Sequence, residues 1–170
     1  MAVTQTKQET DVSMQVDHAE IKTGQLLTML IAVVAFVTKE PAWLMALVLF
    51  FLVTAFYRPA SPFVLVYRFF IKPFGLMQSD YRLDNIQPHA FGQLVGALTV
   101  AVCLTLLYLD YLTAGWIILW ILIGLTLVSW LGWCIGCFLY FQFNRLGLKG
   151  FFRHAPTDKS VVAGQRPRRQ

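Results

Sequence analysis

The chain has 170 residues, of which 57% are hydrophobic and only 14% are charged. Soluble globular domains carry about 25% charged residues, so this composition excludes an ordinary soluble domain and predicts an integral membrane protein. The formal net charge of +5 does not indicate nucleic-acid binding, because the basic residues flank apolar runs and do not form a cluster.

The first half of the chain predicts a transmembrane helical hairpin. Residues 24–38 and 42–57 are two apolar runs, and the short segment between them contains Pro41. Proline breaks a continuous helix but is tolerated in the first turn of a new one. We therefore expect two spans with a tight turn, at the start of a four-helix transmembrane domain that covers residues 21–144.

A shorter apolar segment, residues 61–72, predicts a helix that lies in the headgroup region of the membrane. Ser61 is a suitable N-cap, Pro62 suits the first helical position, and Arg68 and Lys72 stand four residues apart. The segment is too short to span a bilayer. We expect an amphipathic helix whose two cations contact lipid headgroups or water; a buried re-entrant segment is the alternative.

Two further spans are expected in the second half. Residues 90–109 form a run of twenty residues without a charge, which is the length that a bilayer requires. The next uncharged stretch, residues 111–144, is longer than one span needs, and we place the fourth span at residues 115–136. The helix either continues unbroken, or it breaks at Gly132 so that a new helix begins near Cys134.

The distribution of basic residues predicts the orientation. Of the 14 lysines and arginines, all except Lys39 precede the first span, lie between the second and third spans, or follow the fourth. Under the positive-inside rule both termini are then cytoplasmic. Residues 1–20 are expected to be a disordered polar tail and residues 145–170 a basic tail, in a multi-pass protein of the bacterial inner (plasma) membrane.

The most distinctive stretch is "GWCIGCFLYF", in which Cys134 and Cys137 stand three apart. The pair is a candidate catalytic redox pair, and Trp133 precedes it as in thioredoxin-like active sites. Such a motif works at a helix start, where the dipole and free amides lower the thiol pKa; otherwise the cysteines are small apolar fillers. We expect no metal or cofactor, because one Cys-x-x-Cys supplies two of the four usual zinc ligands and His89 would have to be brought in.

Small and polar residues around the pair predict close helix packing. Gly92 and Gly96 on the third span, and Gly132 and Gly136 on the fourth, are two small-xxx-small pairs that let helix backbones approach. Gln93 is a long polar side chain within the third span. We expect it to bond to a neighbouring helix, and a ligand contact is the alternative.

Three stretches, "SPFVLVYRFFIKP", "FGQLVG" and "GWCIGCFLYF", resemble the bacterial small membrane proteins of the domain of unknown function family 4395. The resemblance covers roughly residues 16–143, and its most specific part is the terminal Gly-aromatic-Cys-x-Gly-Cys signature. It implies an all-α membrane protein of four helices with paired cysteines at positions 134 and 137. It implies no activity.

Three functions are compatible with these patterns. The first is a membrane thiol protein that exchanges electrons or sulfur with a cytoplasmic thiol or sulfur-carrier protein; the reducing cytoplasm would hold its cysteines as a dithiol, which disfavours quinone reduction. The second is a structural or assembly subunit of a membrane complex, in which the cysteines pack or support a homo-oligomer. The third, solute passage, is weaker because the spans lack charged residues.

Overall fold

The computed structural model describes residues 15–84, 86–145 and 164 of the chain. The elements in chain order are β1 (Gln15–Asp17), α2 (His18–Thr38), α3 (Pro41–Phe56), a 3₁₀ turn (Arg58–Ala60), α4 (Pro62–Val66), a π-helical turn (Tyr67–Ile71), β2 (Tyr81–Leu83), α5 (Ile86–Tyr108), α6 (Leu112–Leu131) and α7 (Ile135–Arg145). The predicted all-α class is confirmed, with the addition of one short β-ribbon.

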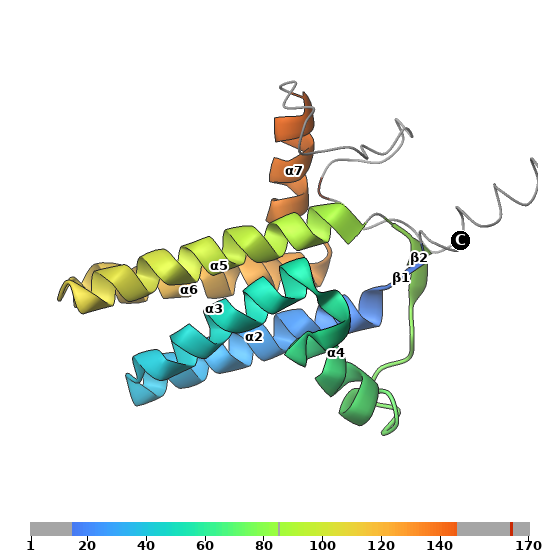
Figure 1. Cartoon of the computed structure of the whole chain (residues 1–170), viewed down its shortest axis with the longest axis horizontal. Helices are drawn as coiled ribbons and strands as arrows, with labels where there is room; N and C mark the ends of the chain where they lie inside the picture. Colours follow the sequence, from blue (N-terminus) through green and yellow to red (C-terminus); the bar gives the residue numbers. More distant parts are fainter. Residues whose placement is uncertain (1–14, 85, 146–163, 165–170) are drawn as a thin grey trace, which may run out of the picture.

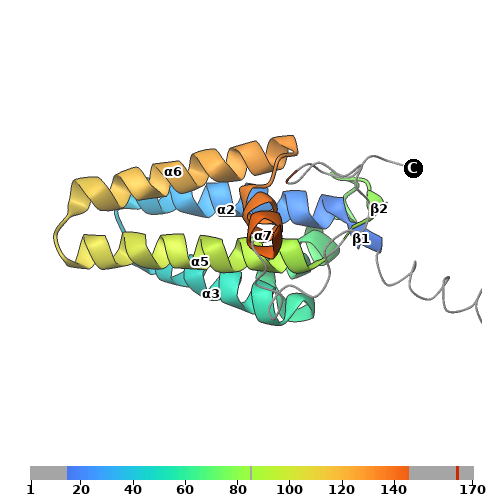
Figure 2. The same cartoon turned by 90° about the horizontal axis from the view of Figure 1, so that it is seen from above.

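Helices α2, α3, α5 and α6 form a bundle, and α7 turns away from its axis (Figure 1; Figure 2). Helix α2 packs against α3 and α6, and α5 packs against the same two helices. The two hairpin turns lie at one end, where Lys39 and Asp110 adopt φ angles of 58° and 62°. The other end carries the ribbon, α4 and α7. Buried side chains close the bundle interior: Ala32, Ala35, Leu44, Leu47, Val100, Cys103 and Leu119.

The outer surface of the bundle is apolar. Large side chains such as Leu30, Leu49 and Leu98 are more than half exposed, which is the reverse of the pattern in a soluble helix. Helices α2, α5 and α6 are long and apolar enough to cross a membrane, whereas α3 has only 16 residues. The composition-based expectation of membrane-spanning helices is thus met by three helices, and α3 is a shorter fourth member of the bundle.

The helix bounds differ from the predicted spans in two ways. Helices α2 and α5 begin earlier than residues 24 and 90, because polar residues of the connecting segments join their first turns. The fourth helix, expected to reach residue 136, ends at Leu131 because Gly132 adopts a φ of 120°. Of the two alternatives that the sequence left open, an unbroken helix or a break at Gly132, the structure therefore has the break.

The segment at residues 61–72 is helical, as expected, but it also contacts the helix bundle, which was not expected. Pro62 occupies the first turn of α4 as predicted, but the Ser61 side chain does not cap the helix. Its hydroxyl instead lies 2.6 Å from the Thr54 hydroxyl of α3, which ties the segment to the bundle. Arg68 and Lys72 are exposed, as a headgroup contact requires.

A two-stranded antiparallel ribbon, β1 with β2, was not predicted from the sequence. Asp17, the last residue of β1, is 8% exposed. The carboxylate of Asp17 accepts hydrogen bonds from the Ala19 amide at 3.0 Å, the Asp80 amide at 3.0 Å and the Tyr67 hydroxyl at 2.8 Å. One side chain therefore caps α2 and joins it to the ribbon and to the turn after α4.

Replacing Asp17 with alanine should destabilise this end of the molecule. Three donors, two of them in buried hydrogen bonds, would lose their acceptor, which costs about 2 kcal/mol or more, equivalent to a fall of about 4–8 °C in the unfolding temperature of a chain of this size. Thermal unfolding of the detergent-solubilised protein measures the effect. The control is Glu40→Ala, because the exposed Glu40 side chain makes no capping bond to α3. Equal unfolding temperatures for the two variants would contradict the assignment.

Candidate thiol site

The site begins where α6 ends. The Gly132 amide donates to the Ser129 carbonyl at 3.1 Å, and the Trp133 amide donates to the Val128 carbonyl at 3.3 Å. These two bonds, with a positive φ at glycine, form the Schellman motif that terminates a helix. Helix α6 therefore stops before the cysteines, and they belong to the start of α7.

Cys134 is the N-cap residue of α7. Its carbonyl accepts the first intrahelical bond, from the Phe138 amide at 3.0 Å, and its Sγ accepts the Cys137 amide at 3.3 Å. The Cys134 amide donates to the Gly164 carbonyl at 2.8 Å. The sulfur thus takes the place of the Ser or Asp oxygen of an ordinary N-cap, at the positive end of the helix dipole.

Helices α5 and α7 meet at two glycines. A Cβ built on Gly136 would lie 2.5 Å from the Gly92 Cα, and a Cβ on Gly92 would lie 3.7 Å from the Gly136 Cα and 4.0 Å from the Cys134 Sγ. No other residue fits at position 136 unless the backbones move apart. The predicted close packing beside the thiols is therefore present, between Gly92 and Gly136.

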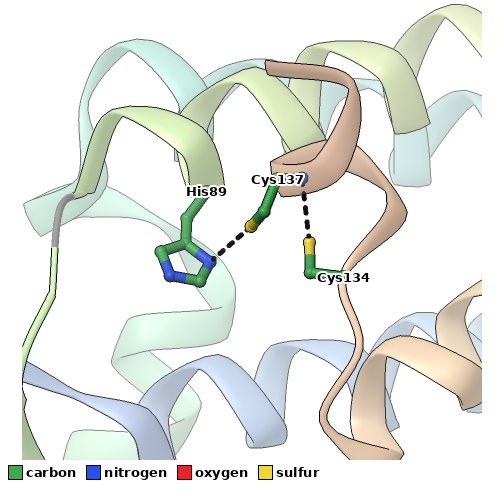
Figure 3. Close-up of side chains that lie close together, drawn as sticks. All are labelled: His89, Cys134 and Cys137. Carbon is green, nitrogen blue, oxygen red and sulfur yellow. Dashed lines mark hydrogen bonds between the residues drawn. The ribbon is translucent and has the colours of Figure 1, made fainter. Parts of the chain in front are cut away.

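This contact brings His89 of α5 to the cysteines (Figure 3). Its Nδ1 lies 3.7 Å from the Cys137 Sγ, and its Nε2 lies 2.9 Å from Asp84 Oδ2. The same carboxylate oxygen lies 3.1 Å from Nε2 of His18, a residue that is 1% exposed. A carboxylate that bonds to Nε2 orients the ring so that Nδ1 faces the thiol.

The surroundings of the two thiols shift their pKa values in opposite directions. The pKa of Cys134 lies well below its usual range, first because the Cys137 thiol donates a hydrogen bond to it and next because of the positive charge of His89. The Cys137 amide and the Ser129 hydroxyl add to this, and burial opposes it. The pKa of Cys137 is raised, because it donates that hydrogen bond, is buried and lies near the negative charges of Cys134 and Asp84.

The Asp84 carboxylate remains charged in this cluster. Burial acts to raise its pKa, but the hydrogen bonds from His18 and His89 and their positive charges together hold it far below its usual range. Asp84 is thus a fixed negative charge beside both rings.

Three of these residues could also hold a metal ion. The ligand atoms of His89, Cys134 and Cys137 all lie within 4.8 Å of one another, and Asp84 would orient the histidine as in many zinc sites. The sequence indicated two possible ligands, those of the Cys-x-x-Cys motif, and the fold adds His89 as a third. A structural zinc site takes four ligands, and this cluster of described residues supplies three.

The other residues that the sequence singled out do not all lie at the thiol site. Gly96 contacts the Phe51 ring of α3 and not α7, since a Cβ there would lie 3.1 Å from the ring. Trp133 packs on Phe138, with ring centroids 5.6 Å apart. Gln93 has a buried Oε1 that accepts no hydrogen bond from the described residues, so this oxygen shows no bond to a neighbouring helix. Arg68 and Lys72 lie outside the site.

Asp84 and His18 were not identified from the sequence. Both stand in polar segments just before an apolar helix, and no local spacing relates them to the cysteines. The sequence did contain one signal: Asp84 stands five residues before His89, and an apolar run follows directly.

The sequence model of the family described as "Domain of unknown function (DUF4395)" matches residues 16–145, and the chain belongs to this family. This confirms the resemblance found in the sequence. No curated protein and no solved structure matches the chain.

Alkylation of Cys134 should reach its full rate at a lower pH than alkylation of a free thiol. Only the thiolate reacts, so a lowered pKa leaves Cys134 reactive well below about 8.5, the pKa of free cysteine, and its rate falls only as the pH drops through the lowered value. Peptide-resolved mass spectrometry with iodoacetamide measures the rate at each cysteine. Cys137→Ala should move the pH midpoint of Cys134 alkylation upward. If the midpoint of the parent equals the pKa of a free cysteine, this account is contradicted.

Proposed function

We propose that this member of the DUF4395 family is a membrane thiol protein whose Cys134 and Cys137 exchange electrons or sulfur with a cytoplasmic partner protein. The observation that carries the proposal is the position of Cys134 as N-cap of α7, with its Sγ accepting the Cys137 amide. A helix start is where reactive thiols of redox proteins lie. A filler cysteine needs neither a helix break nor a histidine beside it.

The two cysteines have different roles in exchange. The Cys134 thiolate attacks one sulfur of the partner's disulfide, forms a mixed disulfide and releases the partner's other sulfur as a thiolate. Cys137 then attacks Cys134, which forms the Cys134–Cys137 disulfide and releases the partner as a dithiol. In its neutral form, His89 can accept the Cys137 proton at Nδ1, which lies 3.7 Å from the Cys137 Sγ. Two electrons pass to the partner, and the same steps in reverse let a partner dithiol reduce the Cys134–Cys137 disulfide.

The partner could also transfer sulfur by the same first step. Attack of the Cys134 thiolate on the outer sulfur of a carrier's persulfide breaks that S–S bond, leaves a persulfide on Cys134 and releases the carrier thiolate. Cys137 can then release the extra sulfur by forming the disulfide. Both schemes use Cys134 as nucleophile and Cys137 as the resolving thiol.

The proposed setting is a bacterial inner membrane crossed four times, with both termini on the cytoplasmic side. Three helices have spanning length, and α3 packs between α2 and α5 as the fourth member. The ribbon, α4 and the start of α7 share one end of the bundle (Figure 1). The positive-inside rule assigns that end to the cytoplasm, where Arg68 and Lys72 would meet anionic headgroups.

Oxidised glutathione distinguishes the two cysteines. In Cys137→Ser the glutathione should remain on Cys134, because no thiol is present to resolve the mixed disulfide. The parent should instead release it and form the Cys134–Cys137 disulfide. In Cys134→Ser, adduct formation at position 137 should be at least about tenfold slower, since the pKa of that thiol is raised. Intact-protein mass spectrometry follows all three reactions.

The matched control is Cys103→Ser. The Cys103 thiol is buried in the bundle, where it donates to the Gly115 carbonyl at 3.1 Å, and this variant should react as the parent does. If Cys134→Ser and Cys137→Ser accept glutathione at equal rates, the assigned roles are wrong. If the parent does not react at all, a structural or assembly role is the better explanation.

A further inference from the structure

A cavity of about 430 Å³ lies beside the thiol pair. It is lined by α2, α3, α5 and α6 and by the start of α7, and Cys134, Gly92 and Gly136 form part of its wall. Pockets for small molecules have volumes of about 300–1,000 Å³. Cys134 therefore forms part of the wall of a cavity large enough for a small molecule.

The polar groups of the cavity suit a neutral ligand. Gln25 and Gln93 line it, and the Oε1 atom of each is buried without a hydrogen-bond partner among the described residues. The Gln25 amide group donates to the Ser129 hydroxyl at 2.6 Å. Such buried acceptors are costly unless a ligand or water donates to them.

The charged groups of the cavity wall are already paired. Arg58 Nη2 lies 2.7 Å from Glu20 Oε1, and His89 is held by Asp84 at 2.9 Å. Among the described lining residues, no unpaired cation is present for an anionic ligand such as a sulfur oxyanion. A neutral ligand would leave these pairs intact.

Three residues of the cavity lining are large, apolar or aromatic, and exposed: Phe56 (78%), Tyr57 (63%) and Ile86 (42%). They stand at the end of α3 and the start of α5, next to the segment expected at the headgroup level. A molecule dissolved in the membrane would enter here more readily than a water-soluble one.

We propose that this cavity binds the head group of a membrane quinone, which oxidises the Cys134–Cys137 dithiol. This rests on the thiol function proposed above. A quinone is a neutral, flat, membrane-soluble molecule that takes up two electrons, as many as one dithiol supplies. Its carbonyls accept hydrogen bonds and its reduced hydroxyls donate them; the buried Oε1 atoms of Gln25 and Gln93 can accept from the hydroxyls, and the Gln93 amide group can donate to a carbonyl.

The electron and proton balance is complete. The Cys134 thiolate attacks a ring carbon and forms a C–S bond. Cys137 then attacks the Cys134 sulfur, so an S–S bond forms, the C–S bond breaks and its electron pair stays on the ring. The Cys137 proton passes through His89 to one ring oxygen, and a proton from water reaches the other. The products are one disulfide and one hydroquinone, and a partner dithiol restores the pair.

The sequence disfavoured quinone reduction because cytoplasmic cysteines rest as a dithiol. A dithiol is, however, the state that donates electrons to a quinone, and what the sequence could not show was a membrane-accessible chamber beside Cys134. The direction of flow is then from a partner dithiol, through the cysteine pair, to the quinone.

The test uses the reduced full-length protein in detergent micelles with decylubiquinone, whose ring carbons all carry substituents and so do not retain thiols as stable adducts. The parent should reduce one quinone per molecule and form one Cys134–Cys137 disulfide. Ultraviolet absorbance follows the quinone, and mass spectrometry follows the disulfide. Cys134→Ser should reduce none.

Gln93→Leu tests the cavity. Loss of the amide should slow quinone reduction at least about tenfold relative to the same variant's exchange with oxidised glutathione. The matched control is Gln142→Leu on α7, outside the cavity lining. Its ratio of quinone reduction rate to glutathione exchange rate should equal that of the parent. A Gln93→Leu ratio equal to that of the parent would show reaction outside the cavity and overturn the proposal.

The glutathione reaction separates the two proposals. If the parent exchanges with glutathione but does not reduce decylubiquinone, the quinone site is refuted and the thiol function stands. If the parent reacts with neither, both fail.

Discussion

The contact between Gly92 and Gly136 is the constraint on which the site depends. With a side chain on Gly136 the two backbones could not lie so close, and α7 would not sit against the start of α5. Only this approach brings a histidine of α5 within 3.7 Å of the Cys137 sulfur. Gly132 has a separate task, since its positive φ ends α6 and lets Cys134 begin a new helix.

The polar end of the molecule supports this arrangement through a few buried carboxylates. Asp17 joins α2 to the ribbon, and the ribbon places Asp84 between His18 and His89. Because the bundle itself offers an apolar exterior, the charges needed to orient a histidine gather at this end. The cysteine pair therefore lies at the same end of the bundle as these charged groups.

Sequence patterns predicted the features that depend on local composition. Long uncharged runs predicted the helices, Pro41 the hairpin turn, and the small residues the close packing at Gly136. The pairing of Gly92 with Gly136, rather than a contact through Gly96, depends on where α6 ends, which a 34-residue uncharged stretch leaves undecided. The cluster of Asp84, His18 and His89 depends on a ribbon of three-residue strands, too short to produce a recognisable alternation.

The most direct test of this account is the alkylation rate of Cys134 in Gly136→Ala at a pH well below the alkylation midpoint of the parent. A methyl group there must push α7 away from α5, so the account predicts a rate at least about tenfold below that of the parent, equivalent to a rise of about one pKa unit. Gly124→Ala on α6 is the control, because a Cβ there would meet no atom within 4 Å. Equal rates in the two variants would contradict the claim that the glycine contact creates the reactive thiol.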